Sequence, residues 1–232
     1  MPLNNEAVRR AEIQQDFLRD VQHHTMRVLH EDGVYRHLSF TNNGSSVYRF
    51  DLVTYPGFLV YSGDMGCFVF QRLHDMLEFF RSDRVNGEEL SINCGYWAEK
   101  LQAVDGQRHR GSATELDTDK FRAVVNQQRI QWMRDAKYDN MLDKAQRRQL
   151  WEAVDDDVLR HVAELHDDGD RAMYAAYDFV WRPDLDYSRN GWGFCDLWEH
   201  DFTRYTSTFL WCCYALAWGI KQYDIAKAAR PA

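Results

Sequence analysis

Residues 34–81, VYRHLSFTNNGSSVYRFDLVTYPGFLVYSGDMGCFVFQRLHDMLEFFR, decide the fold of this 232-residue chain. The stretch holds four β-type runs, and turn-forming pairs such as Asn43-Gly44 and Pro56-Gly57 separate them. These runs predict strands at 34–40, 47–54, 58–62 and 67–73. Because the links are too short for a crossover, neighbouring strands must be antiparallel. From His74 the apolar spacing becomes that of a helix, which we expect to cover the sheet.

The flanking segments are predicted to be helical. Upstream, apolar side chains three and four residues apart predict a helix over 6–31, which ends at Asp32-Gly33. Downstream, a short helix at 96–104 and a polar linker at 105–114 precede predicted helices at 119–137, 144–165, 170–181 and 196–226. The predicted fold class is α+β: a four-stranded antiparallel meander flanked by helices, continuing into a helix-rich C-terminal part. We expect residues 1–104 and 115–232 to form the two parts, packed as one unit.

Composition indicates a folded protein without a general affinity for nucleic acid. The chain is 45% hydrophobic and 14% aromatic, and its net charge of -8 leaves neither half basic. The five Cys are odd in number and form no CxxC pair, so neither a disulfide framework nor a zinc site is indicated. The longest uncharged apolar-rich run spans 16 residues (205–220), whereas a bilayer helix needs about 20. With a polar first segment that has no signal-peptide pattern, we predict a cytoplasmic protein without membrane contact or cofactor.

The histidines and Asp64 are the only candidates for catalysis. His37 on the first predicted strand and Asp64 at a turn would together suit a small metal-dependent hydrolase or nuclease. However, neither HxxxH nor HExxH spacing occurs, and an Asp between glycines also suits a tight turn. No P-loop, GxGxxG or GxSxG motif is present. We therefore predict no metal site, and catalysis by His37 and Asp64 is kept as an alternative to a non-enzymatic role.

Two acidic runs are the first candidates for a partner surface. They consist of Asp155, Asp156, Asp157 and of Asp167, Asp168, Asp170. Their spacing does not fit a calcium-binding loop. Mimicry of a nucleic-acid backbone requires a continuous acidic face, which Arg residues at 147, 148, 160 and 171 interrupt. The ordinary alternative is a solvated helix face followed by a capping loop.

The loop at 181–194 is the second candidate for a partner surface. Tyr187, Arg189 and Trp192 are of the residue types that dominate binding energy at protein interfaces, and the loop contains glycines that help to present them. The equally supported alternative is a long loop that Trp192 and Phe194 pin to the core.

Three motifs are specific enough to compare with a family. They are GDMG (63–66) with FQRLHDMLEFFR (70–81), GYWAEKL (95–101), and FLWCCYA (209–215) with WGI (218–220). In these motifs the chain resembles a family of hypothetical proteins from tailed phages and prophages, over about residues 32–224. The resemblance offers no established activity or site residue to transfer.

What the resemblance implies is a phage-encoded accessory protein in the cytoplasm of the infected or lysogenic bacterial host. Because such proteins often act against host defences, it favours a non-enzymatic inhibitor, anti-CRISPR-like or directed at another defence system, that binds and occludes a host protein complex. The acidic runs and the 181–194 loop are then the expected partner surface. Two alternatives stay open: the metal-dependent hydrolase or nuclease, and a homo-oligomeric structural protein with a Trp-rich self-interface.

Overall fold

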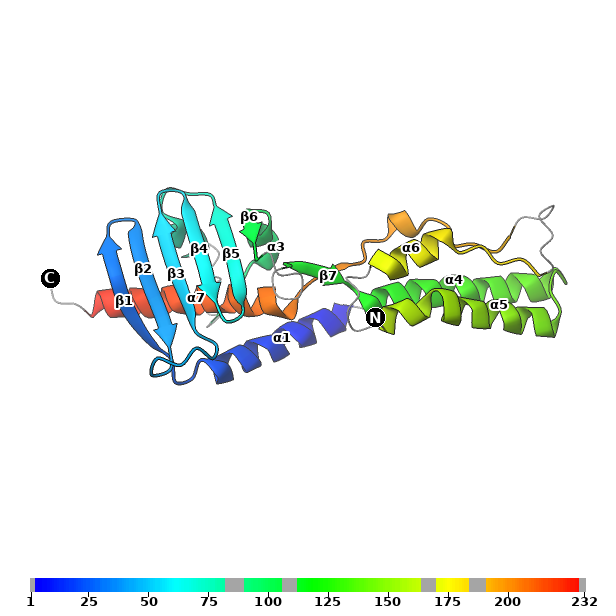
Figure 1. The fold of residues 1–232 in the computed structure, drawn as a ribbon, viewed down its shortest axis with the longest axis horizontal. Coiled ribbons are helices and arrows are strands. Elements are labelled where there is room, and N and C mark those ends of the chain that lie inside the picture. Colours follow the sequence, from blue (N-terminus) through cyan, green and yellow to red (C-terminus); the bar gives the residue numbers. More distant parts are fainter. Residues whose placement is uncertain (1–2, 82–89, 106–111, 164–169, 184–190, 230–232) are drawn as a thin grey trace. The chain divides into compact units, whose positions relative to one another are not determined.

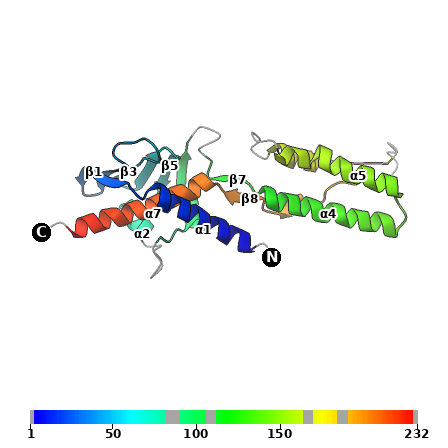
Figure 2. The same cartoon turned by 90° about the horizontal axis from the view of Figure 1, so that it is seen from below.

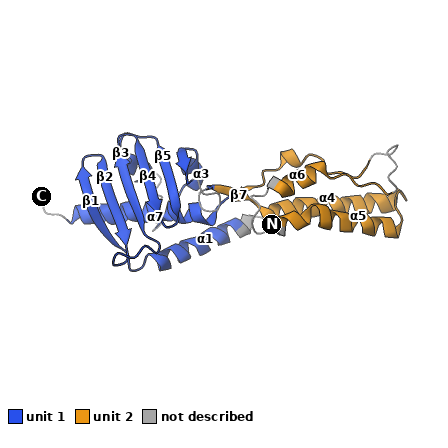
Figure 3. Cartoon of the chain, viewed as in Figure 1, with its two compact units in different colours: residues 1–113, 205–232 blue, residues 114–204 orange. Residues whose placement is uncertain are grey.

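The computed structural model describes residues 3–81, 90–105, 112–163, 170–183 and 191–229. Contacts divide the chain into two compact units, shown in Figure 3. Unit 1 comprises residues 1–113 and 205–232, and unit 2 comprises residues 114–204. Unit 2 is therefore inserted into the sequence of unit 1, between the sheet and the last helix.

The described part of unit 1 contains a six-stranded antiparallel sheet whose strand order follows the sequence. Its strands are β1 (Thr25–Asp32), β2 (Tyr35–Thr41), β3 (Phe50–Tyr55), β4 (Phe58–Gly63), β5 (Gly66–Gln71) and β6 (Leu101–Val104). The links from β3 to β4 and from β4 to β5 are two residues long, as the sequence predicts, whereas the link from β2 to β3 has eight residues. Gly57, between β3 and β4, has φ +84°, a conformation that residues with a Cβ rarely adopt.

The α+β class and the antiparallel meander are confirmed, but the predicted number of four strands is wrong. The segment that forms β1 was expected to continue the first helix, which instead ends at Asp20. The Asp32-Gly33 dipeptide, which was expected to end a helix, instead lies at the turn of the β1–β2 hairpin, in which Val28 pairs with Leu38. β6 was expected to be part of a helix at 96–104. It pairs with β5, Phe68 opposite Val104, and completes the sheet.

The helices of unit 1 cover one face of the sheet (Figures 1 and 2). They are α1 (Leu3–Asp20), α2 (Met76–Arg81), α3 (Cys94–Ala98) and α7 (Ser207–Ala228). α7 is buried over most of its circumference, which explains why its sequence is apolar on all sides. At Gly219 of α7 a Cβ would lie only 3.0 Å from the Phe40 ring, so the absence of a side chain lets helix and sheet pack closely. No described element of unit 1 covers the opposite face of the sheet, where the valines of β3, β4 and β5 are half-buried.

The position of α7 corrects two predictions. Residues 205–232 belong to unit 1, whereas we expected them to group with the preceding helices as part of 115–232. The helix predicted at 196–226 begins only at Ser207, where the Thr206 hydroxyl caps it by accepting a hydrogen bond from the Phe209 N–H (3.1 Å). Before this cap, the chain forms a 3₁₀ turn, η2 (Leu197–Glu199), and the strand β8 (Thr203–Tyr205).

Unit 2 is mainly helical. The chain enters it through β7 (Thr114–Leu116), which forms a two-stranded sheet with β8. Between these strands lie α4 (Thr118–Tyr138), α5 (Lys144–Asp157), the 3₁₀ turn η1 (Leu159–Ala163) and α6 (Asp170–Asp178). The predicted helices at 119–137, 144–165 and 170–181 correspond to these elements, although the second is divided into α5 and η1. Among the helices that the structure describes, none is long and apolar enough to cross a membrane.

Candidate functional site

Two neighbouring helices, α4 and α5, form an open groove in the described part of unit 2. The link between them, residues 139–143, is short, so the helices run antiparallel side by side (Figure 1). Asn140 turns the chain with φ +53°, and Asp143 begins α5 with a capping box that it forms with Gln146. Their apolar faces, including Val125 and Leu150, are fully buried in the core of the unit. This packing fixes which side chains of the two helices meet at the surface.

The groove between α4 and α5 has an apolar floor and a cationic rim. It has a volume of about 450 Å³. Its lining comprises Ile130, Met133, Arg134 and Lys137 of α4 and Arg147, Arg148 and Trp151 of α5. The residues of α4 are spaced at i, i+3, i+4 and i+7, which places them on one face of that helix. In α5, Trp151 lies three residues after Arg148 and four after Arg147, so these side chains also share one side of their helix, and two helix faces combine into one site.

Trp151 is the largest side chain of the groove, and Arg129 holds it from beneath. The guanidinium carbon of Arg129 lies 3.7 Å from the centre of the Trp151 ring, within the range of a cation–π interaction. Arg129 Nη1 also donates to Asp155 Oδ1 at 2.6 Å, and its side chain is only 8% exposed. One face of the indole is thus covered by a fixed cation, and the ring is half-buried. The floor of the groove is therefore preorganised.

The four cations on the rim are only partly neutralised by the protein itself. Arg147 donates to the Leu142 carbonyl at 2.6 Å, so its charge has no carboxylate partner there. Arg148 pairs with Glu152 at 2.7 Å, but both side chains are largely exposed and the pair is weak in water. Arg134 and Lys137 have no hydrogen-bond or ion-pair partner among the described residues. The rim therefore carries uncompensated positive charge.

A second hollow, of about 570 Å³, continues along α4 from the groove. Its lining is rich in side-chain amides and shares Ile130 and Arg134 with the groove. Gln128 at this hollow donates to the Cys195 carbonyl (2.8 Å) and accepts from the Cys195 N–H (3.2 Å). Gln128 thus anchors the segment before η2 rather than a ligand.

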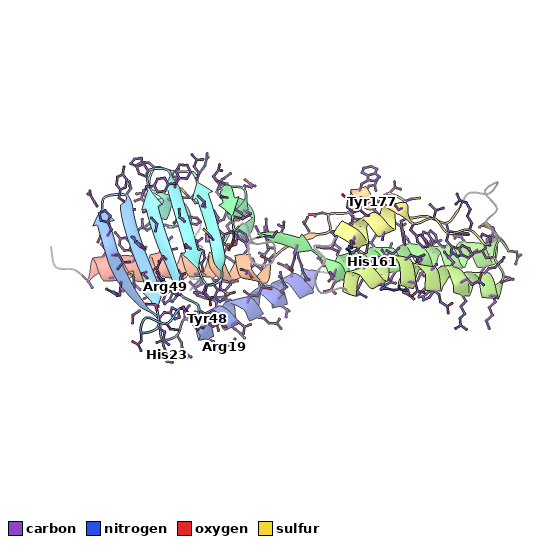
Figure 4. All side chains as sticks on the ribbon, viewed as in Figure 1. Arg19, His23, Tyr48, Arg49, His161 and Tyr177 are labelled. Atoms are coloured by element: carbon purple, nitrogen blue, oxygen red, sulfur yellow. The ribbon has the colours of Figure 1, made fainter. Side chains whose placement is uncertain are left out.

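The structure does not bring His37 and Asp64 together. Asp64 Oδ2 accepts a hydrogen bond from the Tyr48 N–H at 3.0 Å, while its own N–H donates to the Arg49 carbonyl at 2.9 Å. Asp64 therefore stabilises the chain at Tyr48, which has φ +54°. Figure 4 shows Tyr48 and Arg49 near the end of the sheet where Arg19, in the last turn of α1, and His23, just after α1, also lie.

His37 lies on β2, far from Asp64. Across the sheet it is level with Val53 of β3 and with Val60 of β4. Asp64 follows Val60 by four residues, which corresponds to about 13 Å along the strand direction. His37 Nε2 lies 3.5 Å from Asp51 Oδ2, on the neighbouring strand β3. Over the described residues, no group of three or more His, Cys, Asp or Glu side chains is placed to hold a metal ion.

The acidic residues do not form one described surface. Asp155 is the partner of Arg129, and Asp156 pairs with Arg160 at 2.7 Å. Asp157 is exposed at the end of α5. Asp167 and Asp168 lie outside the described residues, and Asp170 is the first residue of α6, where only its backbone is described. The predicted role of these residues in partner binding stays a prediction.

The 181–194 loop is described only at its two ends, and Tyr187 and Arg189 lie outside the described residues. Trp192 exchanges two backbone hydrogen bonds with Trp181 (2.8 and 2.9 Å) and lies 6.2 Å, between ring centres, from Trp132. This geometry favours the alternative in which Trp192 pins the loop to the core. Exposed aromatic surface is found instead on α6, where Tyr174 is 68% exposed and Tyr177 points away from α4 and α5 (Figure 4).

The residues of the groove were missed in the sequence. Arg147 and Arg148 were interpreted there as interruptions of an acidic surface, and Trp151 was given no role beyond lying in the helix predicted at 144–165. A usable signal was present in the sequence. Arg147 and Arg148 lie about one helical turn before Trp151, and Arg134 and Lys137 are also one turn apart on the preceding helix. The sequence does not show that these faces of α4 and α5 lie next to each other.

No family model, no curated protein and no solved structure matches this chain. The function must therefore be argued from the surface itself. The α4–α5 groove combines an apolar floor, a Trp151 ring held by Arg129, and cationic side chains that lack carboxylate partners among the described residues. It is the described site with the clearest capacity to bind a partner.

Proposed function

We propose that this protein is a non-enzymatic inhibitor that binds a partner protein through the α4–α5 groove. The observation that carries the proposal is the composition of that groove, in which Trp151 is fixed in place and four Arg or Lys side chains surround it. Trp and Arg are the residue types most enriched where binding energy is concentrated at protein interfaces. A rigid Trp also loses little conformational entropy when a partner covers it.

The same composition speaks against catalysis at this site. Of the residue types that line the groove, Ile, Met, Trp and Arg do not serve as nucleophile or general base, which leaves only Lys137. The side chains of the groove can hold a ligand by hydrogen bonds and apolar contact. They include no nucleophile–base pair such as hydrolases use.

The partner we propose is a host defence complex, in keeping with the resemblance to tailed-phage and prophage proteins. Binding would occlude a surface that the complex needs, in the cytoplasm of the bacterial host. This is the anti-CRISPR-like or other anti-defence role expected from the sequence, with the groove in place of the acidic runs as the main contact.

The proposal is tested by a quantitative pulldown from lysate of a defence-bearing bacterial host. The bait is the tagged full chain, compared with the double variant Arg134→Glu, Lys137→Glu. A control variant, Arg27→Glu with Lys120→Glu, also reverses one Arg and one Lys that are exposed, but outside the groove. We expect stoichiometric defence subunits with the wild type and the control, and their loss with the groove variant. Recovery of the bait alone would contradict the proposal for that host.

A further inference from the structure

We infer that the occupant of the α4–α5 groove is a short acidic segment of the partner protein that inserts an apolar side chain against Trp151. The inference rests on the proposed function and specifies the chemistry of the partner. Three properties of the groove carry it: its apolar floor, its cationic rim, and the negative charge of the surrounding unit.

The apolar floor selects a segment with at least one large apolar side chain. Ile130 is 39% exposed, and Met133 and Trp151 are half-buried, so the floor is accessible to a ligand. Met adapts its shape to different apolar partners, while Arg129 restrains the Trp151 ring. A volume of about 450 Å³ is in the range of ligand sites, about 300–1,000 Å³, and has room for a few side chains of a partner rather than for a whole folded element. The groove therefore takes a few side chains.

The cationic rim selects carboxylates beside that apolar side chain. Arg134 and Lys137 have no described partner, and Arg147 donates only to a carbonyl oxygen. A guanidinium presents paired N–H donors that match the two oxygens of an Asp or Glu. Bound carboxylates would supply the negative charge that these three cations lack in the described residues.

The charge of the whole unit limits the acidic surface to a short segment. Residues 114–204 contain 13 Lys or Arg and 20 Asp or Glu, a net charge of -7, so the groove is a positive site on a negative unit. A broad polyanion would be repelled by the carboxylates around the groove. This argues against a nucleic-acid strand, whose phosphates extend beyond any one site. A peptide segment can place its carboxylates only where the cations lie.

The test is direct binding of designed peptides to the full-length protein, measured by fluorescence polarisation. The first probe is a fluorescein-labelled peptide in which Asp and Glu alternate with Leu and Phe. A second peptide replaces Leu and Phe by Ala, a third replaces the acidic residues by Lys, and a fourth probe is a labelled single-stranded DNA oligonucleotide. We expect saturable binding of the first probe only, weakening as salt is added.

Two variants locate the binding. Trp151→Ala and the double variant Arg134→Glu, Lys137→Glu should each weaken the first probe about tenfold or more, while Arg27→Glu with Lys120→Glu leaves it unchanged. The charge variants replace exposed residues, so they keep the test valid even if Trp151→Ala does not fold; circular dichroism checks each one. Equal binding of the acidic Ala peptide, or tighter binding of the oligonucleotide, would overturn the inference.

Three further outcomes separate this inference from the proposed function. If the wild-type protein self-associates in sedimentation and the groove variant does not, the occupant is a second copy of the chain and the inference is wrong. If host defence subunits are captured by the wild type and by the groove variant alike, the inhibitor role stands but the groove is not its contact. If no host protein is captured while the acidic probe binds at the groove, the groove chemistry is right and the proposed function is wrong.

Discussion

The contact between Arg129 and Trp151 can be measured with a double-mutant cycle. The variants are Arg129→Met, which keeps most of the apolar stem, Trp151→Leu, and the two combined. At 3.7 Å, with the Arg129 side chain only 8% exposed, the cation–π interaction lies near the desolvated end of its range. We expect a coupling free energy of about 1.5 kcal/mol.

The ion pair of Arg129 with Asp155 does not confuse this measurement. Because Asp155 is 47% exposed, solvent screens the pair and its contribution is small, on the order of 0.2–1 kcal/mol. It is present in both forms with Arg129 and absent in both forms with Met, so it cancels from the coupling term.

The assay is urea unfolding followed by far-UV circular dichroism, with the transition of unit 2 fitted separately if the two units unfold independently. A coupling below about 0.3 kcal/mol, the usual error of additivity, would mean that Arg129 and Trp151 act independently. That result would refute the claim that Arg129 preorganises the floor of the groove.

Three other predictions follow from the packing and charges of the protein. Gly219→Val should lower the free energy of unfolding by about 2 kcal/mol, because the buried Phe40 ring leaves no room for the added atoms; an unchanged thermal midpoint would contradict this packing. In the folded protein Cys195 should react first with a thiol reagent, since burial raises the pKa of the thiols in α7; mass spectrometry of partly labelled protein checks the order. Burial raises the pKa of Asp75, but its hydrogen bonds to Arg36 outweigh this and leave the pKa below its ordinary 3.8. The stability this contributes is therefore complete above about pH 4 and lost as the pH falls through the lowered pKa, and Asp75→Asn should remove that part of the acid unfolding curve.

The sheet could be predicted from the sequence because its signals are local. β2 to β5 are short β-type runs joined by Gly- and Pro-containing turns, and each turn fixes the direction of the next strand. β1 was missed because Val28 happens to continue the helical spacing of Phe17 and Val21, although the helix ends at Asp20. Asp32-Gly33 suits both a helix end and a two-residue hairpin turn, and in the structure it closes the hairpin that pairs Val28 with Leu38.

The groove could not be predicted because it depends on how two helices pack against each other. Each of its helices was expected at nearly its observed position, yet the site exists only where the cations of α4 face Trp151 of α5. The insertion of unit 2 into the sequence of unit 1 could not be predicted either. Because α7 is apolar on all sides, its sequence does not show which core it joins. The sequence indicated the acidic runs as the partner surface instead, because consecutive Asp residues are easy to recognise. In the structure, Asp155 and Asp156 are paired with arginines.

We propose that this protein inhibits a bacterial defence system by binding through the α4–α5 groove. The most direct measurement is the plating efficiency of a targeted phage on a defence-bearing host that expresses the protein. We predict that the wild type and the control Arg27→Glu, Lys120→Glu restore plating, and that Arg134→Glu, Lys137→Glu does not, at equal protein levels. Full restoration by the groove variant would contradict the account of the site, and no restoration by the wild type across defence-bearing hosts would contradict the function.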